Sequence, residues 1–201
     1  KNYDGKFEGP MRVRAALAKS KNLVTVRVLQ AIGPQYAQDY IARFGFDPKL
    51  HPPYLTMGLG AGSVTPLQMA RLLAFVANDG WLVTPHVVSD DGTARRASDI
   101  DSSPYRSTRK RIPGMSSETL SAVRAGLRAA VEEPLGTGFK TVRLQGVSIA
   151  GKTGTAETSP DTPDHAWFTG YVPAENPRYI VVVALEHGGS GSKASGPIAR
   201  E

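Results

Sequence analysis

Two short motifs carry residue types that can do chemistry together, although they lie far apart in the sequence. The first is Lys152, Thr153, Gly154 and Thr155, and the second is Ser20-Lys21-Asn22. In the first motif an ammonium group and two hydroxyl groups stand among small side chains, an arrangement suited to holding an anionic carboxylate. Taken alone, each motif has a plainer interpretation: a glycine-rich turn with a solvated lysine, and a serine that caps a helix.

The small residues around Lys152 predict a strand whose backbone a ligand can approach. Apolar Val147 and Ile149 alternate with Ser148 and Ala150, which is the period of a half-buried strand. Further along, Gly151, Gly154 and Ala156 leave the main chain uncovered. A ligand lying along these positions would exchange main-chain hydrogen bonds with the strand.

The elements that must position these motifs are helices before the Lys152 strand and two further strands after it. Apolar runs predict strands over residues 166–172 and 178–187, and the short connections predict antiparallel pairing of three consecutive strands. Helices are predicted over residues 11–17, 23–32 with Ser20 as N-cap, 34–44, 66–77 with Thr65 as N-cap, and 116–133, with another beginning at Pro197. Residues 81–88 predict one more strand. The fold class is therefore α/β of the α+β type: an antiparallel sheet flanked by helices, with an all-helical lobe in the first eighty residues.

Composition limits the classes of protein to which the chain can belong. Its 201 residues, 40% of them hydrophobic, are enough for one domain of ordinary size, or at most two small ones. The absence of cysteine excludes a disulfide framework and a cysteine metal site. The four histidines are scattered without metal-ligand spacing, so we expect neither a metal nor another cofactor. No apolar run approaches the roughly 18 residues that span a bilayer.

The net charge of +6 comes largely from one polar segment, residues 93–114, which reads as a solvated linker. It contains six basic residues but Tyr105 as its one aromatic residue, whereas interleaved aromatics would support nucleic-acid binding. We therefore expect no nucleic-acid partner, and a basic polyanion-binding protein remains the less favoured alternative. The chain accordingly divides into a helical lobe (1–80), a strand and basic linker (81–114), and a helix, sheet and final helix (115–201).

Taken together, the motifs resemble the transpeptidase domain of penicillin-binding proteins, in the superfamily of serine β-lactamases and D,D-peptidases. The matching segments are residues 17–22, 57–60 with 64–70, and 151–157, in the order that the family shows. The first seventy residues look closer to the bifunctional class A enzymes, and residues 164–171 and 188–198 closer to class B. Both assignments of subclass remain open.

The resemblance implies an acyl transfer in which a serine attacks the D-Ala-D-Ala end of a peptidoglycan stem peptide and an amine of a neighbouring stem resolves the acyl-enzyme. It implies catalytic roles for Ser20 as proton relay, Asn22 as partner of the substrate amide, and Lys152 as a positive field. Thr153, Gly154 and Thr155 would bind the terminal carboxylate of a substrate or of a β-lactam, and the Thr155 N–H would form half of an oxyanion hole. Lys21 would point to solvent. The parent protein would be anchored at the outer face of the bacterial cytoplasmic membrane, in the cell envelope.

One family element has no counterpart in these residues. The family places its nucleophile in S-x-x-K, with lysine one helical turn after serine and several tens of residues before S-x-N. The sequence matches S-x-x-K only at Ser107 to Lys110 and Ser190 to Lys193, both in the wrong order and in polar segments without a helical pattern. We therefore expect this chain alone not to be acylated, and we interpret it as the C-terminal part of a transpeptidase. A non-catalytic binding or sensing module of the same fold is the alternative.

Overall fold

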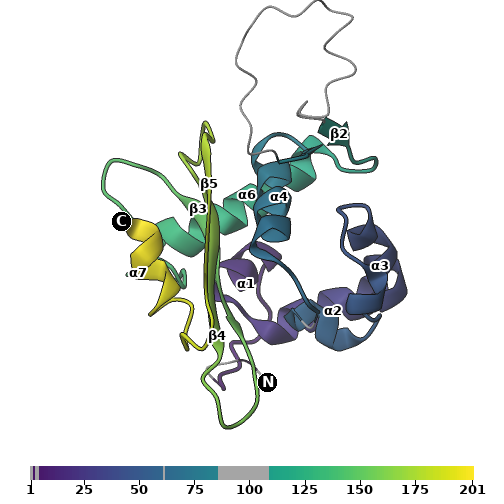
Figure 1. Ribbon diagram of the computed structural model, residues 1–201, viewed down its shortest axis with the longest axis horizontal. Helices are drawn as coiled ribbons and strands as arrows, with labels where there is room; N and C mark the ends of the chain where they lie inside the picture. The colour runs from purple at the N-terminus through teal and green to yellow at the C-terminus, as the bar shows by residue number, and fades with distance from the viewer. Residues whose placement is uncertain (1, 3–4, 61, 86–108) are drawn as a thin grey trace, which may run out of the picture.

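The computed structural model describes residues 2, 5–60, 62–85 and 109–201, arranged as helices around a small antiparallel sheet (Figure 1). The sheet is seen nearly edge-on at the centre of that view, with helices on both sides. The elements in chain order are α1 (Val13–Lys19), α2 (Asn22–Ile32), α3 (Pro34–Ala42), the 3₁₀ turns η1 (Pro48–Leu50) and η2 (Leu55–Leu59), α4 (Pro66–Ala77), β1 (Trp81–Val83), β2 (Arg109–Arg111), α6 (Ser117–Glu132), β3 (Ala150–Ala156), β4 (His165–Val172), β5 (Tyr179–Leu185) and α7 (Ser195–Arg200).

The three strands predicted to follow one another do form one antiparallel sheet, in the order β3-β4-β5. In its register Lys152 lies opposite Thr169, and Thr169 lies opposite Val182. Strand β3 is an edge of this sheet, so one of its sides is not paired within the sheet. The α+β fold class predicted from the sequence is confirmed.

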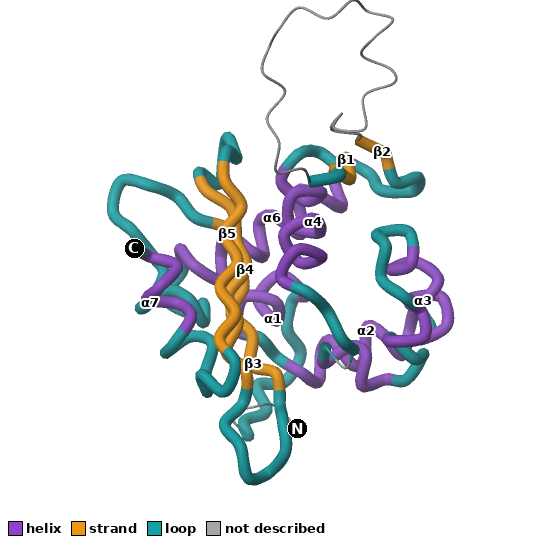
Figure 2. Tube along the Cα trace, in the orientation of Figure 1, coloured by secondary structure: helices purple, strands orange, loops and turns teal. Residues whose placement is uncertain are grey.

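Helices lie on both sides of the sheet (Figure 2), and an apolar core forms on each of its faces. On one face Phe75 of α4 and Leu120 of α6 pack with Tyr171 of β4. On the other face Phe168 of β4 packs with Val131 from the end of α6, and α7 contributes Ala199. Helix α6 thus contributes to both cores, and it also packs along α1. The sheet, α6 and α1 together form the frame on which the site is built.

Local capping explains where the principal helices begin. Thr65 accepts a hydrogen bond from the Gln68 N–H while the Gln68 side chain bonds back to the Thr65 N–H, a complete capping box. Ser116 caps α6 by accepting from the Thr119 N–H. Helix α3 begins at Pro34 as predicted and ends at Ala42, two residues before the predicted end.

Strand β1 ends at Val83, before the predicted end of the strand, and pairs with β2. The prediction of a solvated linker over residues 93–114 is wrong at Arg109–Arg111, which form β2. The guanidinium carbons of Arg109 and Arg111 lie 4.9 and 5.6 Å from the centre of the Trp81 ring. Both cations therefore make cation–π contacts with this ring. The rest of the predicted strand 81–88 beyond residue 85, and the linker up to residue 108, lie outside the described residues. Within the described ranges, no helix combines the length and apolarity needed to cross a membrane.

Candidate acyl-transfer site

Ser20 lies at the junction of α1 and α2, where the chain changes direction in two residues. It has a left-handed backbone, with φ of 56° and ψ of 49°. Its N–H bonds to the Leu17 carbonyl at 3.2 Å, and the Lys21 N–H bonds to the Ala16 carbonyl at 2.9 Å. These paired bonds form a Schellman motif, so Ser20 terminates α1. The prediction that Ser20 caps the following helix is wrong, because a left-handed residue cannot supply the extended backbone of an N-cap. The residue before α2 is instead Lys21, whose own side chain does not cap the helix, and the Asn2 side chain accepts from the Leu23 N–H in the first turn at 3.1 Å.

The residues beside Ser20 are held by one carboxylate. Lys21 is 4% exposed, and its ammonium pairs with Glu8 at 2.7 Å. Lys19 pairs with the other oxygen of the same carboxylate. These lysines hold the pKa of Glu8 below its ordinary value, with Lys19 the larger cause. The expectation that Lys21 points to solvent is wrong, because the acidic side chain of Glu8 packs against it. Two ion pairs and two backbone hydrogen bonds therefore hold the segment around Ser20 in place.

Lys152 projects from β3 to Ser20 and makes the contact that joins the two sequence motifs. Its Nζ donates to Ser20 Oγ at 2.8 Å, across 132 residues of sequence, and to the Thr153 carbonyl at 2.7 Å. The side chain is half-buried while Ser20 is exposed, so the pair lies at the border of the interior. Burial lowers the pKa of Lys152 to about 8. The ammonium therefore releases its proton nearer to neutral pH than an ordinary lysine does, a property common in groups that take part in acid–base chemistry.

The other predicted residues follow along β3 and α2. Thr153 is buried, and its hydroxyl lies 2.6 Å from the Thr137 hydroxyl. Thr155 is exposed, and its hydroxyl accepts from the Gly191 N–H at 3.2 Å. Strand alternation directs Thr153 and Thr155 away from the face that Lys152 uses. Asn22 is the first residue of α2, two positions after Ser20, and is half-buried.

The glycines of this strand have different roles. Gly154 is exposed, and a Cβ there would meet only the Trp167 Cβ, at 3.4 Å, so the strand is open on the side where that Cβ would lie. Gly151 is buried, and a Cβ there would lie 2.6 Å from the Phe168 ring. The expectation that Gly151 leaves the main chain uncovered is therefore wrong: an aromatic ring occupies the space. Gly154, with Ala156 beyond it, forms the accessible part of the edge strand.

Two residues near β3 were missed by the sequence analysis. Thr137 lies in the turn after α6, and Gly191 lies in the turn before α7, where a Cβ would come within 2.0 Å of the Gly154 carbonyl oxygen. Both residues lie in glycine-rich stretches of the sequence, and such stretches can indicate that the chain passes close to other backbone. Of the two rejected S-x-x-K matches, Ser190 to Lys193 forms this turn, and Ser107 lies outside the described residues.

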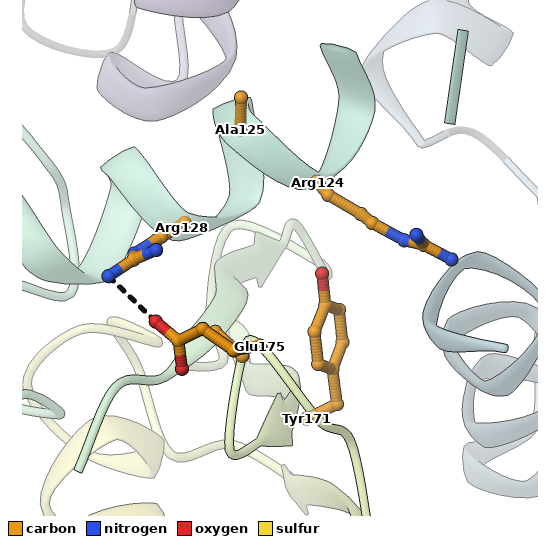
Figure 3. Close-up of a pocket in the computed structure, with 6 residues that line it drawn as sticks. Arg124, Ala125, Arg128, Tyr171 and Glu175 are labelled. Atoms are coloured by element: carbon orange, nitrogen blue, oxygen red, sulfur yellow. Dashed lines mark ion pairs between the residues drawn. The ribbon is translucent and has the colours of Figure 1, made fainter. Parts of the chain in front are cut away.

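A separate cavity of about 210 Å³ opens between α6 and the end of β4 (Figure 3). Arg124 and Arg128 line it from α6, and Arg128 pairs with Glu175 at 2.8 Å. The Tyr171 hydroxyl points towards α6, is fully buried and has no hydrogen-bond partner in this structure. Burial also raises the pKa of Tyr171. The side chain of Tyr171 lies on the same face of the sheet as Lys152, so the cavity and the site share one face.

Comparison with known proteins supports the same assignment. The family model described as the penicillin-binding protein transpeptidase domain matches residues 1–201. The chain belongs to this transpeptidase family. Penicillin-binding protein 1A of Neisseria gonorrhoeae is 35% identical over 189 residues, which cover 92% of this chain and 22% of that protein. Penicillin-binding protein 1A of Vibrio cholerae is 30% identical over 200 residues. The chain thus spans about a fifth of the length of these relatives.

Solved penicillin-binding proteins share the fold. PBP2 of Pseudomonas aeruginosa, solved in complex with WCK 5153, has a TM-score of 0.79 and 26% identity, and the match covers all of this chain and 48% of that one. The D,D-transpeptidase domain of a peptidoglycan glycosyltransferase from Eggerthella lenta has a TM-score of 0.76 at 24% identity and covers 54% of that chain. The antiparallel sheet with flanking helices is therefore that of a penicillin-binding protein transpeptidase domain, from a family of peptidoglycan synthesis.

Proposed function

We propose that this chain forms part of the acyl-transfer site of a peptidoglycan D,D-transpeptidase, with residues 1–201 as part of the transpeptidase domain. Its lobes would be the helices of residues 1–80, the hairpin and linker of 81–114, and the sheet with its helices in 115–201. The observation that carries the proposal is the 2.8 Å hydrogen bond from Lys152 to Ser20. It joins a polarised hydroxyl to a lysine of lowered pKa in a chain of this family.

Ser20 and Lys152 would act together on the leaving group. Because Ser20 Oγ already accepts from the Lys152 ammonium, its own proton is free to be donated to the leaving amine nitrogen. Ser20 would then recover a proton from the attacking nucleophile through a base, which completes the relay. Asn22 would hydrogen-bond the substrate amide, and the Lys152 charge would stabilise the negative charge that develops in the transition state.

The accessible edge of β3 would hold the rest of the substrate. Thr153 and Thr155 would bind the terminal carboxylate through their hydroxyls, on either side of Gly154, where the absence of a side chain leaves room. The Thr155 N–H would serve as one donor of the oxyanion hole. An extended peptide can add to an edge strand through main-chain hydrogen bonds, and the position of β3 in the sheet supports this mode.

The attacking serine and its lysine would come from sequence that precedes residue 1 in a longer parent protein. The ligands of that protein would be peptidoglycan stem peptides and β-lactams, and no cofactor is needed for a serine acyl transfer. It would be a membrane-anchored protein whose transpeptidase domain works at the outer face of the bacterial cytoplasmic membrane, in the cell envelope.

Labelling with a fluorescent penicillin tests the proposal. We expect no covalent label on this chain alone and stoichiometric label on the longer parent protein, mapped to a serine upstream of Ser20. In the parent, Lys152→Ala should reduce the rate of labelling by about 100-fold or more, the range that a lost electrostatic group commands in acyl transfer.

The alternatives predict other results. A folded parent that takes no label would refute the proposal and favour the non-catalytic module. Label on the short chain, mapped to Ser190 or Ser107, would refute the assignment of the nucleophile to preceding sequence.

A further inference from the structure

The turn after α6 contacts both halves of the site. This turn, Gly136-Thr137-Gly138, follows the helix within four residues of its end. The Thr137 N–H donates to the Ala18 carbonyl of α1 at 3.3 Å, and the Thr137 hydroxyl lies 2.6 Å from the Thr153 hydroxyl of β3. Ala18 is two residues before Ser20, and Thr153 is the neighbour of Lys152. One residue therefore connects the segment that carries Ser20 to the strand that carries Lys152.

The two glycines explain why the turn can lie so close to α6. A Cβ at position 136 would be 2.3 Å from the Ala130 carbonyl oxygen, so any larger residue would push the turn off the helix. The Gly138 N–H donates to the same carbonyl at 2.8 Å. Next to the turn, Ala18 packs with Ala129 and Ala130 as a cluster of small buried side chains. Backbone contacts, rather than flexible side chains, thus set the position of Thr137.

The donors and acceptors of the two hydroxyls determine which of them donates when an anion is bound. Each threonine hydroxyl has one proton to donate and two lone pairs that accept. A carboxylate only accepts, so Thr153 must donate its proton to such a ligand and can then bond to Thr137 only by accepting. Because Thr153 is 7% exposed, little water competes for this arrangement. A chain from Thr137 to Thr153 to an anion would strengthen each bond in it.

We infer that Thr137 is a positioning residue: its side chain directs the Thr153 hydroxyl towards an anionic carboxylate, while its main chain fixes the end of α1, and with it Ser20, relative to β3. The inference rests on the proposed function for the identity of the ligand. The contacts themselves do not depend on that function.

The test uses the longer parent protein and compares a β-lactam that has its ring carboxylate with the methyl ester of the same compound. Thr137→Val removes the hydroxyl at nearly constant volume. We expect it to lower the second-order acylation rate for the acid by up to about ten-fold, the upper end of the value of one neutral hydrogen bond, and by less than two-fold for the ester. Thr137→Ser should restore the rate for the acid to within about two-fold, because it keeps the hydroxyl.

A matched control comes from the segment that follows this turn. Thr141 has a buried hydroxyl without a hydrogen-bond partner in this structure, so Thr141→Val should leave both acylation rates unchanged. A loss of similar size for acid and ester in Thr137→Val would show a merely structural role and overturn the inference. No loss for either compound would overturn it as well.

A second measurement separates the inference from the proposed function. In this chain, Thr137→Val and Thr153→Val should each lower the urea midpoint of unfolding, and the double variant should lose no more than the larger single loss, because both remove one bond. Additive losses would refute the contact between the two hydroxyls and with it the inference. A parent that is not acylated by either compound would refute the proposed function, while the double-variant comparison would still decide the contact.

Discussion

The lowered pKa of Lys152 leads to a prediction about stability that needs no substrate. Lys152→Met replaces the ammonium with an apolar side chain of similar length. In the native chain, burial disfavours the charged amine and lowers its pKa from 10.5 to about 8. Folding at neutral pH therefore carries the cost of placing a charge in a half-buried position, and the methionine variant does not carry that cost.

The pH window follows from the two pKa values. Below pH 8 the folded and unfolded chains both hold the proton, so the cost is fully present. Between pH 8 and 10.5 the unfolded chain holds a proton that the folded chain has released, and the native state gains stability as pH rises. The full difference would correspond to about 3 kcal/mol. Because Lys152 is only half-buried and solvent screens its charge, we expect about 1–2 kcal/mol.

Urea unfolding of both proteins at pH 7, 8, 9 and 10 measures this effect. Contributions from other titrating groups are common to both proteins and cancel in the difference between their free energies of unfolding. From pH 7 to pH 10 the free energy of unfolding of the unsubstituted protein should rise by about 1–2 kcal/mol relative to that of Lys152→Met. In Ser20→Ala the rise should begin at lower pH, because the ammonium loses an acceptor. A difference that is flat with pH would show that Lys152 keeps an ordinary pKa and would refute the reasoning.

Two further predictions concern packing around the site. Gly191→Ala places a Cβ within 2.0 Å of the Gly154 carbonyl oxygen and should cost about 1–3 kcal/mol in urea unfolding, whereas Gly154→Ala, whose Cβ has room, should cost less than about 1 kcal/mol. Equal costs for the two would contradict the close approach of the turn to β3. Tyr171→Phe removes a buried hydroxyl that has no partner in this structure. Its free energy of unfolding, from thermal unfolding, should be unchanged or higher by about 1 kcal/mol. A loss above about 2 kcal/mol would show that this hydroxyl is hydrogen-bonded.

The parts of the fold that the sequence predicts are those that local signals determine. The start of α4 is encoded within four positions: Thr65 and Gln68 form the capping box, and Pro66 is the first helical residue. The strands β4 and β5 follow from apolar runs separated by short turns. Such signals act between residues close in sequence, so the structure that they predict does not depend on contacts with distant parts of the chain.

The parts that could not be predicted depend on residues distant in sequence. No residue close to Lys21 in sequence indicates that Glu8 pairs with it, so the sequence predicts a solvent-exposed side chain at this position. Gly151 looks like any other glycine of the strand until Phe168 is placed over it. The resemblance to a family assigned Lys152 and Ser20 to one site, but their hydrogen bond was not predicted, because periodicity alone says nothing about a pair 132 residues apart.

The left-handed backbone of Ser20 has a consequence for how this position can vary. The residue after a helix in a Schellman motif is most often glycine, because a side chain there costs roughly 1 kcal/mol in backbone strain. Selection for stability alone would favour glycine at position 20, whereas the bond from Lys152 requires a hydroxyl. A library of variants sorted by thermal resistance would therefore move away from serine, and under the proposed function a library of the parent protein sorted by acylation would return to it. Position 20 is a place where the two demands on the sequence can be measured against each other.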